Sequence, residues 1–355
     1  MNTDKEFKIL CIDGGGIRGI IPSKFLSKLE NYLSKEKGEE IKLNEYFDLI
    51  CGTSTGGIIA IGLGLGMSAK EIHQLYEENA TQIFGSPNKK RILMLKQLFR
   101  PKYSRNNLSD ILEKAFSQYS DDNDTRLAHS KTRLCIPTYN ASMGKTVVLK
   151  TSHHIGLVRD YQVPAYQVAL ATSAAPIYFT PYHINYKIKK TTNEESLLNM
   201  IDGGIFANNP SLVGLSEALA LGYKFDQIKI LSIGTGLNRL KPKQNKIPSK
   251  GVFSWLSLSK GIPLVEMILQ SQSEITENIM KFIADGIHTD KGERIYYQRF
   301  QTYFTEKKID LDDTSDEKIE ELNTKGENMF NYADKTLLLP FFDNKIEPYK
   351  PFNLI

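Results

Sequence analysis

Short apolar segments that end in glycine-rich turns and lead into helical patterns constrain the fold of this chain most strongly. Phe7–Ile12 is followed by Asp13 and three glycines, and Ile20–Leu33 then has apolar residues at helical spacing. Phe47–Cys51 leads through a second glycine turn into Thr55–Gly66, which is apolar nearly all round. Buried strands that alternate with helices in this way are typical of parallel sheets. The pattern predicts an α/β fold with a mostly parallel sheet and helices on its faces.

The same criteria predict further elements in the middle of the chain. We expect a strand pair at Leu134–Tyr139 and Thr146–Lys150, a short helix at Pro164–Thr172 and a buried strand at Ile228–Ile233. Lys187–Ser196 is polar, so we expect a surface loop there.

The last third of the chain has one clear helical pattern. Ile262–Ile283 has amphipathic spacing, whereas Asp310–Glu321 is so acidic that we expect it to be solvated. The apolar positions of the expected helix are Leu264, Ile268, Ile275, Ile279 and Phe282. No Gly/Ser/Pro-rich linker divides the 355 residues, which favours one main domain with a C-terminal elaboration.

Charge and composition narrow the classes of function. The net charge of +4 is too small to predict binding to a nucleic-acid polymer. Basic residues gather in Asn88–Tyr103 and Asn238–Gly251, beside large apolar side chains such as Trp255. This combination fits an anionic membrane surface, and it fits an ordinary solvated surface equally well. The longest apolar run, Gly56–Met67, has 12 residues, fewer than the roughly 20 that span a bilayer.

The three cysteines and the N-terminus indicate a cytoplasmic protein. Cys11, Cys51 and Cys135 lie in apolar, strand-like segments and form no C-x-x-C pair. We therefore expect buried free thiols, which suit a reducing compartment. The polar segment Met1–Lys8 has no signal-peptide pattern. If the protein meets a membrane, we expect peripheral association.

Gly52-Thr53-Ser54-Thr55-Gly56 is a G-x-S-x-G motif between an expected strand and an expected helix. A serine in such a tight turn is presented at the N-terminus of the helix, whose dipole favours developing negative charge. A structural glycine turn that contains a serine by chance is the alternative. The flanking elements favour Ser54 as a nucleophile.

A second glycine turn, Asp13-Gly14-Gly15-Gly16-Ile17-Arg18-Gly19, has two interpretations. Its glycines fit the G-x-G-x-x-G pattern of dinucleotide-binding folds, but the region Ser34–Asn44 lacks the strand and acidic residue that such folds place about 20 positions later. Consecutive glycines can also direct main-chain N–H groups to one point, as in an oxyanion hole. We favour the oxyanion hole, with Arg18 either binding an anionic headgroup or stiffening the loop.

The base that would activate Ser54 could be a histidine or an aspartate. The histidines are His73, His129, His153, His154, His183 and His288, and none has a distinguishing context. Asp202, in contrast, ends the apolar segment Asn199–Asp202 and precedes Gly203 and Gly204. An aspartate is a weak base unless burial raises its pKa, so this choice requires a site that is partly shielded from water. Such a site favours ester substrates over amides.

In this order, the three glycine turns resemble the catalytic blocks of the patatin-like phospholipase family. Ala171–Pro176 and Asn208–Pro210 also resemble that family, and the similarity covers residues 7–236 with all three blocks intact. The resemblance implies a three-layer α/β/α core at residues 7–236 and a helical C-terminal elaboration at residues 237–355. It implies a Ser54–Asp202 dyad, an acyl-enzyme intermediate, and no metal or other cofactor. The oxyanion hole would comprise main-chain amides of Gly14, Gly15, Gly16 and Thr55.

The resemblance further implies a phospholipid or related lipid as substrate and transient contact with a membrane. Chain length and tail resemble bacterial members that cyclic nucleotides activate during anti-phage defence, so a cyclic-nucleotide activator is expected. The Trp255 region and the helix after it are expected to form a lid or membrane-docking element. Two alternatives stay open: an esterase or thioesterase with a Ser-His-Asp triad that uses His288 or His183, and a non-catalytic nucleotide-binding module. The oligomeric state is not predicted.

Overall fold

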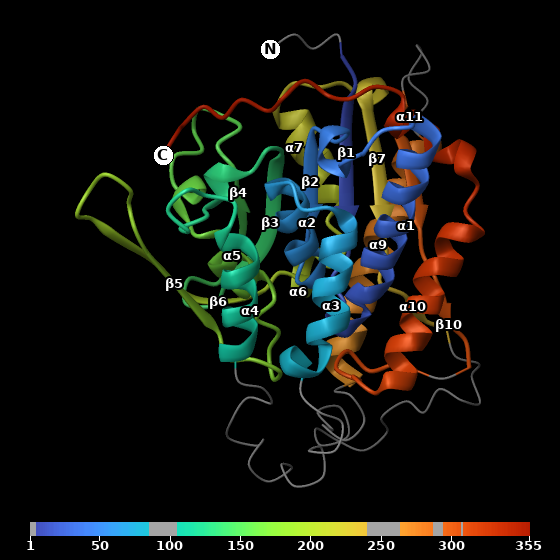
Figure 1. The fold of residues 1–355 in the computed structure, drawn as a ribbon, viewed down its shortest axis with the longest axis horizontal. Coiled ribbons are helices and arrows are strands. Elements are labelled where there is room, and N and C mark those ends of the chain that lie inside the picture. Colours follow the sequence, from blue (N-terminus) through green and yellow to red (C-terminus); the bar gives the residue numbers. More distant parts are fainter. Residues whose placement is uncertain (1–4, 85–104, 240–262, 287–293, 307) are drawn as a thin grey trace, which may run out of the picture.

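The computed structural model of the chain describes residues 5–84, 105–239, 263–286, 294–306 and 308–355. A mostly parallel sheet runs through its centre (Figure 1), with the strand order β5-β6-β3-β2-β1-β7-β9 and with β4 paired to β3. Five of its strands are mutually parallel: β1 (Phe7–Ile12), β2 (Leu49–Gly52), β3 (Arg133–Asn140), β7 (Ile228–Ile233) and β9 (Tyr296–Phe300). The antiparallel additions are β4 (Lys145–Lys150), β5 (Tyr182–Lys187) and β6 (Glu194–Asp202). A separate parallel pair comprises β8 (Leu237–Asn238) and β10 (Tyr303–Phe304).

Helices cover both faces of the sheet, as the sequence predicts. One face carries α1 (Ile20–Lys37), α2 (Thr55–Leu65), α3 (Ala69–Phe84), α4 (Asn106–Ser117), α5 (Ala165–Thr172) and α10 (Asp316–Asn331), with α10 packed on α1. The opposite face carries α7 (Ser211–Ala220) and α9 (Pro263–Gly286). Short helices α6 (Gly204–Ala207) and α11 (Leu339–Phe342) complete the described set.

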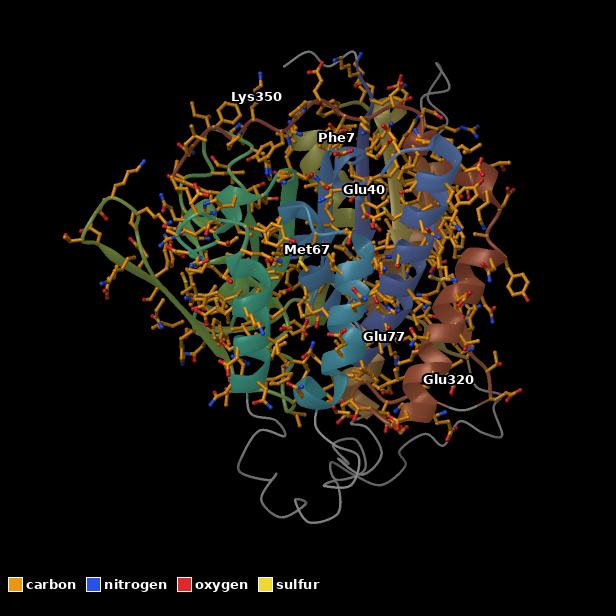
Figure 2. The ribbon with its side chains drawn as sticks, in the orientation of Figure 1. Phe7, Glu40, Met67, Glu77, Glu320 and Lys350 are labelled. Atoms are coloured by element: carbon orange, nitrogen blue, oxygen red, sulfur yellow. The ribbon has the colours of Figure 1, made fainter. Side chains whose placement is uncertain are left out.

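The two faces of the sheet bury separate apolar cores, because successive side chains of a strand point to opposite sides. On β1, Leu10 and Ile12 join the core beneath α1 and α2, whereas Ile9 and Cys11 join the core beneath α7. Figure 2 shows side chains filling the space between the sheet and the helices around it. Each fully buried aliphatic side chain contributes about 1.5–3 kcal/mol to stability.

The described structure confirms the predicted strands at Phe7–Ile12 and Ile228–Ile233, the strand pair β3–β4 and the short helix α5. It also confirms that the three cysteines are buried free thiols. The basic stretch Asn88–Tyr103, most of Asn238–Gly251 and Trp255 lie outside the described residues.

Two predictions for polar segments are wrong. Lys187–Ser196 is not simply a loop, because β5 extends to Lys187 and β6 begins at Glu194, and the two strands pair as a hairpin. One side of β5 packs on the core through Ile184 and Tyr186, whereas the residues that alternate with them are exposed. Asp310–Glu321 is not fully solvated either, since Leu311 and Asp312 are buried.

The C-terminal segment forms part of the central sheet and part of the helical layer that contains α1. Strand β9 pairs in parallel with β7, and α10 packs along α1. The predicted helix at Ile262–Ile283 is confirmed as α9, but its apolar positions face outward: Ile275 is 53% exposed and Phe282 75% exposed. Among the described helices, each is too short or too polar to cross a bilayer.

Candidate active site

The turn between β2 and α2 holds Ser54 in a backbone conformation that the G-x-S-x-G glycines make possible. Ser54 has φ 54° and ψ −123°, in a region that non-glycine residues rarely adopt. A Cβ atom at Gly52 would lie 2.1 Å from the carbonyl oxygen of Gly56, and one at Gly56 would lie 2.3 Å from that of Ile12. The two glycines therefore allow the strands and α2 to approach closely enough to strain the serine.

Ser54 and Asp202 are joined by a direct hydrogen bond. The Ser54 hydroxyl donates to Asp202 Oδ2 at 2.6 Å, and the amide of Gly204 donates to Asp202 Oδ1 at 2.7 Å. Burial raises the pKa of Asp202 to about 6, although these two hydrogen bonds act in the opposite direction. A carboxylate with that pKa is a better proton acceptor near neutral pH than an ordinary aspartate.

The described histidines all have partners away from Ser54. The exposed His183 accepts a hydrogen bond from the amide of Asn199, and His288 lies outside the described residues. The remaining contacts are His73 with Ser23, His129 with Arg126, His153 with Glu217 and His154 with Gly156. Within the described residues, the side-chain partner of the Ser54 hydroxyl is a carboxylate.

The glycine loop after β1 lies beside the serine, but its amides are not equivalent. The Gly14 amide donates to the carbonyl of Asn208 at 3.0 Å, so including Gly14 among the oxyanion donors is wrong. The amides of Gly15, Gly16 and Thr55 have no such acceptor among the described residues. All three residues line the same pocket as Ser54 and Asp202. Two or three main-chain N–H groups in this pocket can therefore donate hydrogen bonds to an oxyanion.

The side chain of Arg18 is held by hydrogen-bond and ion-pair partners within the protein. Its guanidinium is buried, donates to the carbonyl of Ile309 at 3.0 Å through Nε, and lies 3.4 Å from Glu266 on α9. Of the two predicted uses of Arg18, these contacts support stiffening of the loop rather than binding of an anionic headgroup.

Asp13 anchors the loop through a buried ion pair that the sequence did not reveal. Arg299 on β9 donates to both carboxylate oxygens of Asp13, at 3.0 and 2.7 Å, and Ser273 on α9 donates to Asp13 Oδ2 at 2.7 Å. Glu277 accepts from Arg299 Nε at 3.0 Å. No local pattern marks Arg299, because its partner lies 286 residues earlier in the chain. The C-terminal segment therefore positions the glycine loop.

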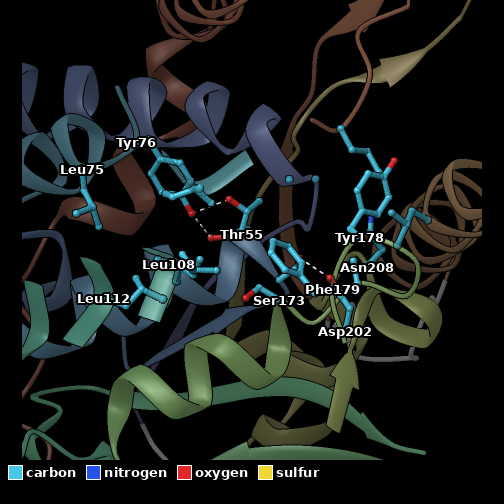
Figure 3. A pocket seen from close by; sticks show the side chains of 18 residues that line it. Thr55, Leu75, Tyr76, Leu108, Leu112, Ser173, Tyr178, Phe179, Asp202 and Asn208 are labelled. Atoms are coloured by element: carbon cyan, nitrogen blue, oxygen red, sulfur yellow. Dashed lines mark hydrogen bonds between the residues drawn. The ribbon is translucent and has the colours of Figure 1, made fainter. Parts of the chain in front are cut away.

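Two further residues support the nucleophile turn. Thr172 Oγ1 accepts a hydrogen bond from the Ser54 amide at 3.0 Å and donates to the carbonyl of Pro137 at 2.6 Å. Thr55 and Tyr76 exchange two hydrogen bonds, drawn as dashed lines in Figure 3, at 2.6 and 2.8 Å. The resemblance had identified the Ala171–Pro176 segment without giving Thr172 this role.

A cavity opens beside Ser54. Its wall is mainly apolar, formed by Ile58, Leu75, Ile83, Leu108, Leu112 and Leu311. In Figure 3, Leu75, Leu108 and Leu112 lie on one side of the pocket and Asp202 and Asn208 on the other. This arrangement suits a long apolar chain that ends in a polar reacting group.

Comparisons with known proteins agree with this geometry. The family model described as patatin-like phospholipase matches residues 10–213, which include Ser54, Asp202 and the glycine loop. A cGAMP-activated phospholipase of Escherichia coli (strain TW11681) is 31% identical over 97% of this chain and 94% of that protein. One from Vibrio cholerae is 35% identical over 65% of this chain and 64% of that protein. Patatin-like protein 2 of Arabidopsis thaliana is 29% identical over 79% of this chain and 73% of that protein.

Proposed function

The chain belongs to the patatin-like phospholipase family and is a lipid ester hydrolase, and on that premise we propose that it releases fatty acids from membrane phospholipids through a Ser54–Asp202 dyad. The observation that carries this proposal is the 2.6 Å hydrogen bond between the two side chains at the edge of an apolar cavity.

In the proposed first step, Ser54 attacks the ester carbonyl while its proton moves to Asp202. The negative oxygen that forms is stabilised by the amides of Gly15 and Gly16, together with Thr55 at the N-terminus of α2. When the tetrahedral intermediate collapses, the leaving alcohol takes the proton from Asp202, and an acyl-enzyme remains. Water then attacks the acyl carbonyl, with Asp202 as its base. Asp202 returns this proton to the Ser54 oxygen as the acyl bond breaks, and the fatty acid leaves.

The cavity supports an acyl ester as the substrate. Its apolar wall, from Leu75 to Leu311, offers the fatty chain a dry environment, and the same dryness keeps the pKa of Asp202 raised. An ester leaving group needs less protonation than an amine, so a carboxylic acid suffices as the general acid.

A fluorophosphonate probe combined with fatty-acid release tests the dyad. Wild-type protein should be labelled at Ser54, and Ser54→Ala should lose both labelling and hydrolysis. Asp202→Asn should lose nearly all hydrolysis, whereas Ser173→Ala, which removes another serine of the same pocket, should keep the label. Full hydrolysis by Asp202→Asn, together with its loss in His183→Ala or His288→Ala, would replace the dyad by the Ser-His-Asp alternative.

Peripheral membrane association is also proposed, because the outer face of α9 is apolar. Six large side chains project from it, each at least 36% exposed: Leu264, Met267, Ile268, Ile275, Ile279 and Phe282. The inner face is mixed, with Ser273 and Thr276 buried against the protein beside the fully buried Met280. A helix that leaves so many large apolar side chains exposed is expected to meet a lipid surface. Leu269, on the same helix, lines the cavity beside Ser54.

Vesicle binding separates this membrane role from catalysis. Ile275→Glu with Phe282→Glu should weaken binding to phospholipid vesicles and slow release of fatty acid from them, while hydrolysis of a water-soluble short-chain ester stays unchanged. Asn278→Glu adds a charge to an exposed position of α9 without removing apolar surface, and it serves as the matched control. Equal vesicle binding by all these proteins would contradict the role of α9.

A cyclic-nucleotide activator is proposed from relatives, and a role in anti-phage defence is proposed from the sequence resemblance alone. Two similar bacterial proteins are named cGAMP-activated phospholipases, and one of them matches 97% of this chain. Fatty-acid release from vesicles should therefore increase when cGAMP is added, and Ser54→Ala should remain inactive in its presence. The same rate with and without cGAMP would contradict activation and leave the hydrolase proposal intact.

A further inference from the structure

A second cluster of reactive side chains lies on the face of the sheet that α7 covers. Cys11, Cys51 and Cys135 occupy directly paired positions on the adjacent strands β1, β2 and β3. All three thiols are fully buried in the apolar core beneath α7. A Cβ atom at Gly214 of α7 would lie 3.2 Å from Cys51 Sγ and 3.3 Å from Cys11 Sγ, so α7 approaches this row closely.

His153 and Glu217 complete the cluster at the β3 end of the row. Glu217 projects from α7, and His153 follows β4. One ligand atom each from Cys135, His153 and Glu217 lie within 4.8 Å of one another, and all three residues are buried. His153 Nε2 is 2.9 Å from Glu217 Oε1. Sulfur, imidazole nitrogen and carboxylate oxygen are therefore directed at one small volume.

We propose that Cys135, His153 and Glu217 bind one zinc-class metal ion, and that the thiol of Cys51, which pairs with Cys135 on the adjacent strand, moves in as the fourth ligand. Zinc takes these donors in tetrahedral sites, at about 2.3 Å from sulfur and about 2.0–2.2 Å from nitrogen and oxygen. Such bonds place the ligand atoms roughly 3.3–3.8 Å apart, which the present separations reach with small side-chain shifts. Mixed sulfur and imidazole donors disfavour magnesium and calcium.

The surrounding residues fit the outer shell of such a site. Thr151 Oγ1 lies 2.8 Å from His153 Nδ1, which orients the ring and leaves Nε2 for the ion. Lys150 contacts the other carboxylate oxygen of Glu217, Oε2, whereas Oε1 is paired with His153 Nε2, and the ion would take the place of that hydrogen bond. If both Cys51 and Cys135 bind as thiolates, the formal charges of a divalent ion, the two thiolates, Glu217 and Lys150 sum to zero. A buried site requires such a balance.

The inferred ion is structural, and it joins β2, β3 and α7 behind the catalytic turns. Coordination releases the thiol protons to solvent, and no bond of the substrate is involved. The inference is independent of the proposed function, because Cys135, His153 and Glu217 are absent from the cavity that contains Ser54.

Metal binding by the full-length chain tests the inference directly. Chelator-treated, reduced protein should take up one equivalent of Zn²⁺ and unfold at a higher temperature when loaded. Co²⁺ in place of Zn²⁺ should give a thiolate-to-cobalt charge-transfer band with tetrahedral d–d absorption. Wild-type protein that gives no such band, or takes up no zinc, would overturn the inference whatever the variants do.

Matched variants locate the site. Cys135→Ser and His153→Gln should each weaken zinc affinity by more than the roughly 10–100-fold typical of losing an outer-shell partner. Cys11→Ser removes the third thiol of the same row, which is outside the proposed ligand set, and should keep zinc affinity and the cobalt band. Undiminished binding by Cys135→Ser, with its fold verified by circular dichroism, would also refute the site.

Discussion

Replacing Asp202 by asparagine should abolish hydrolysis and yet stabilise the fold at neutral pH. Burial raises the pKa of Asp202 from 3.8 to about 6, so the folded protein holds this proton more tightly than the unfolded chain. At 1.36 kcal/mol per pH unit, keeping the carboxylate ionised in the folded state costs about 3 kcal/mol. Asparagine has nearly the same shape and can still accept from Gly204, but it carries no charge.

The sign of the pH dependence follows from the raised pKa. The proton on Asp202 stabilises the folded state fully below about pH 3.8, and this contribution is lost as the pH rises through about 6. The stability advantage of Asp202→Asn should therefore be largest at pH 7–8 and shrink by about 1.4 kcal/mol on going to pH 5.

Urea denaturation of both proteins at pH 5, 6, 7 and 8 measures the effect. Asp121→Asn removes an exposed aspartate far from the dyad in sequence and is the matched control. An Asp202→Asn protein that is less stable than wild type at pH 8, or whose difference from wild type is constant with pH, would refute the reasoning. In that case the carboxylate would be solvated in the folded protein, with a pKa near that of the unfolded chain.

Three other predictions concern the reaction itself. The kcat/KM for a soluble ester should rise with pH through about 6, as Asp202 loses its proton, and should fall about tenfold per pH unit below pH 6. A midpoint of this pH profile that moves strongly with temperature would indicate an imidazole base instead. Gly15→Pro, which deletes one main-chain N–H, should lower kcat by about 10²–10³, and a rate near that of wild type would exclude this amide from the oxyanion hole. Arg299→Lys keeps the charge beside Asp13 but loses the two-pronged contact, so kcat should fall about 10–100-fold with little change in KM. Urea denaturation must show that this variant is folded, and an unchanged kcat would mean that the ion pair only stabilises the protein.

The two side chains of the proposed dyad were predictable because each is marked locally. Ser54 lies in the glycine turn between β2 and α2, Asp202 ends β6 and precedes Gly203, and a tight turn between a strand and a helix leaves few other residue choices. The Gly14 amide shows the limit of this reasoning. Glycine indicates that a peptide can turn, but only the fold shows that the Asn208 carbonyl already accepts that N–H.

Residues whose role depends on tertiary contacts could not be predicted from the sequence. Arg299 acts on a partner 286 positions away, and neither segment carries a pattern that names the other. For α9 the spacing predicted a helix, and an apolar face normally packs inward. Periodicity reports that two faces differ, but it does not say which one the protein covers.

The orientation of α9 has a physical cause in the glycine loop. Arg18 and Asp13 carry charges into a buried region, and such charges require partners. Helix α9 supplies Glu266 to Arg18 and Ser273 to Asp13, while its Glu277 holds Arg299. These three polar side chains must therefore point inward, which leaves large apolar side chains such as Ile275 and Phe282 outside. One helix thus has its outer face available to lipid and its inner face bonded to the loop that would bind the oxyanion, so we expect lipid contact and loop position to be linked.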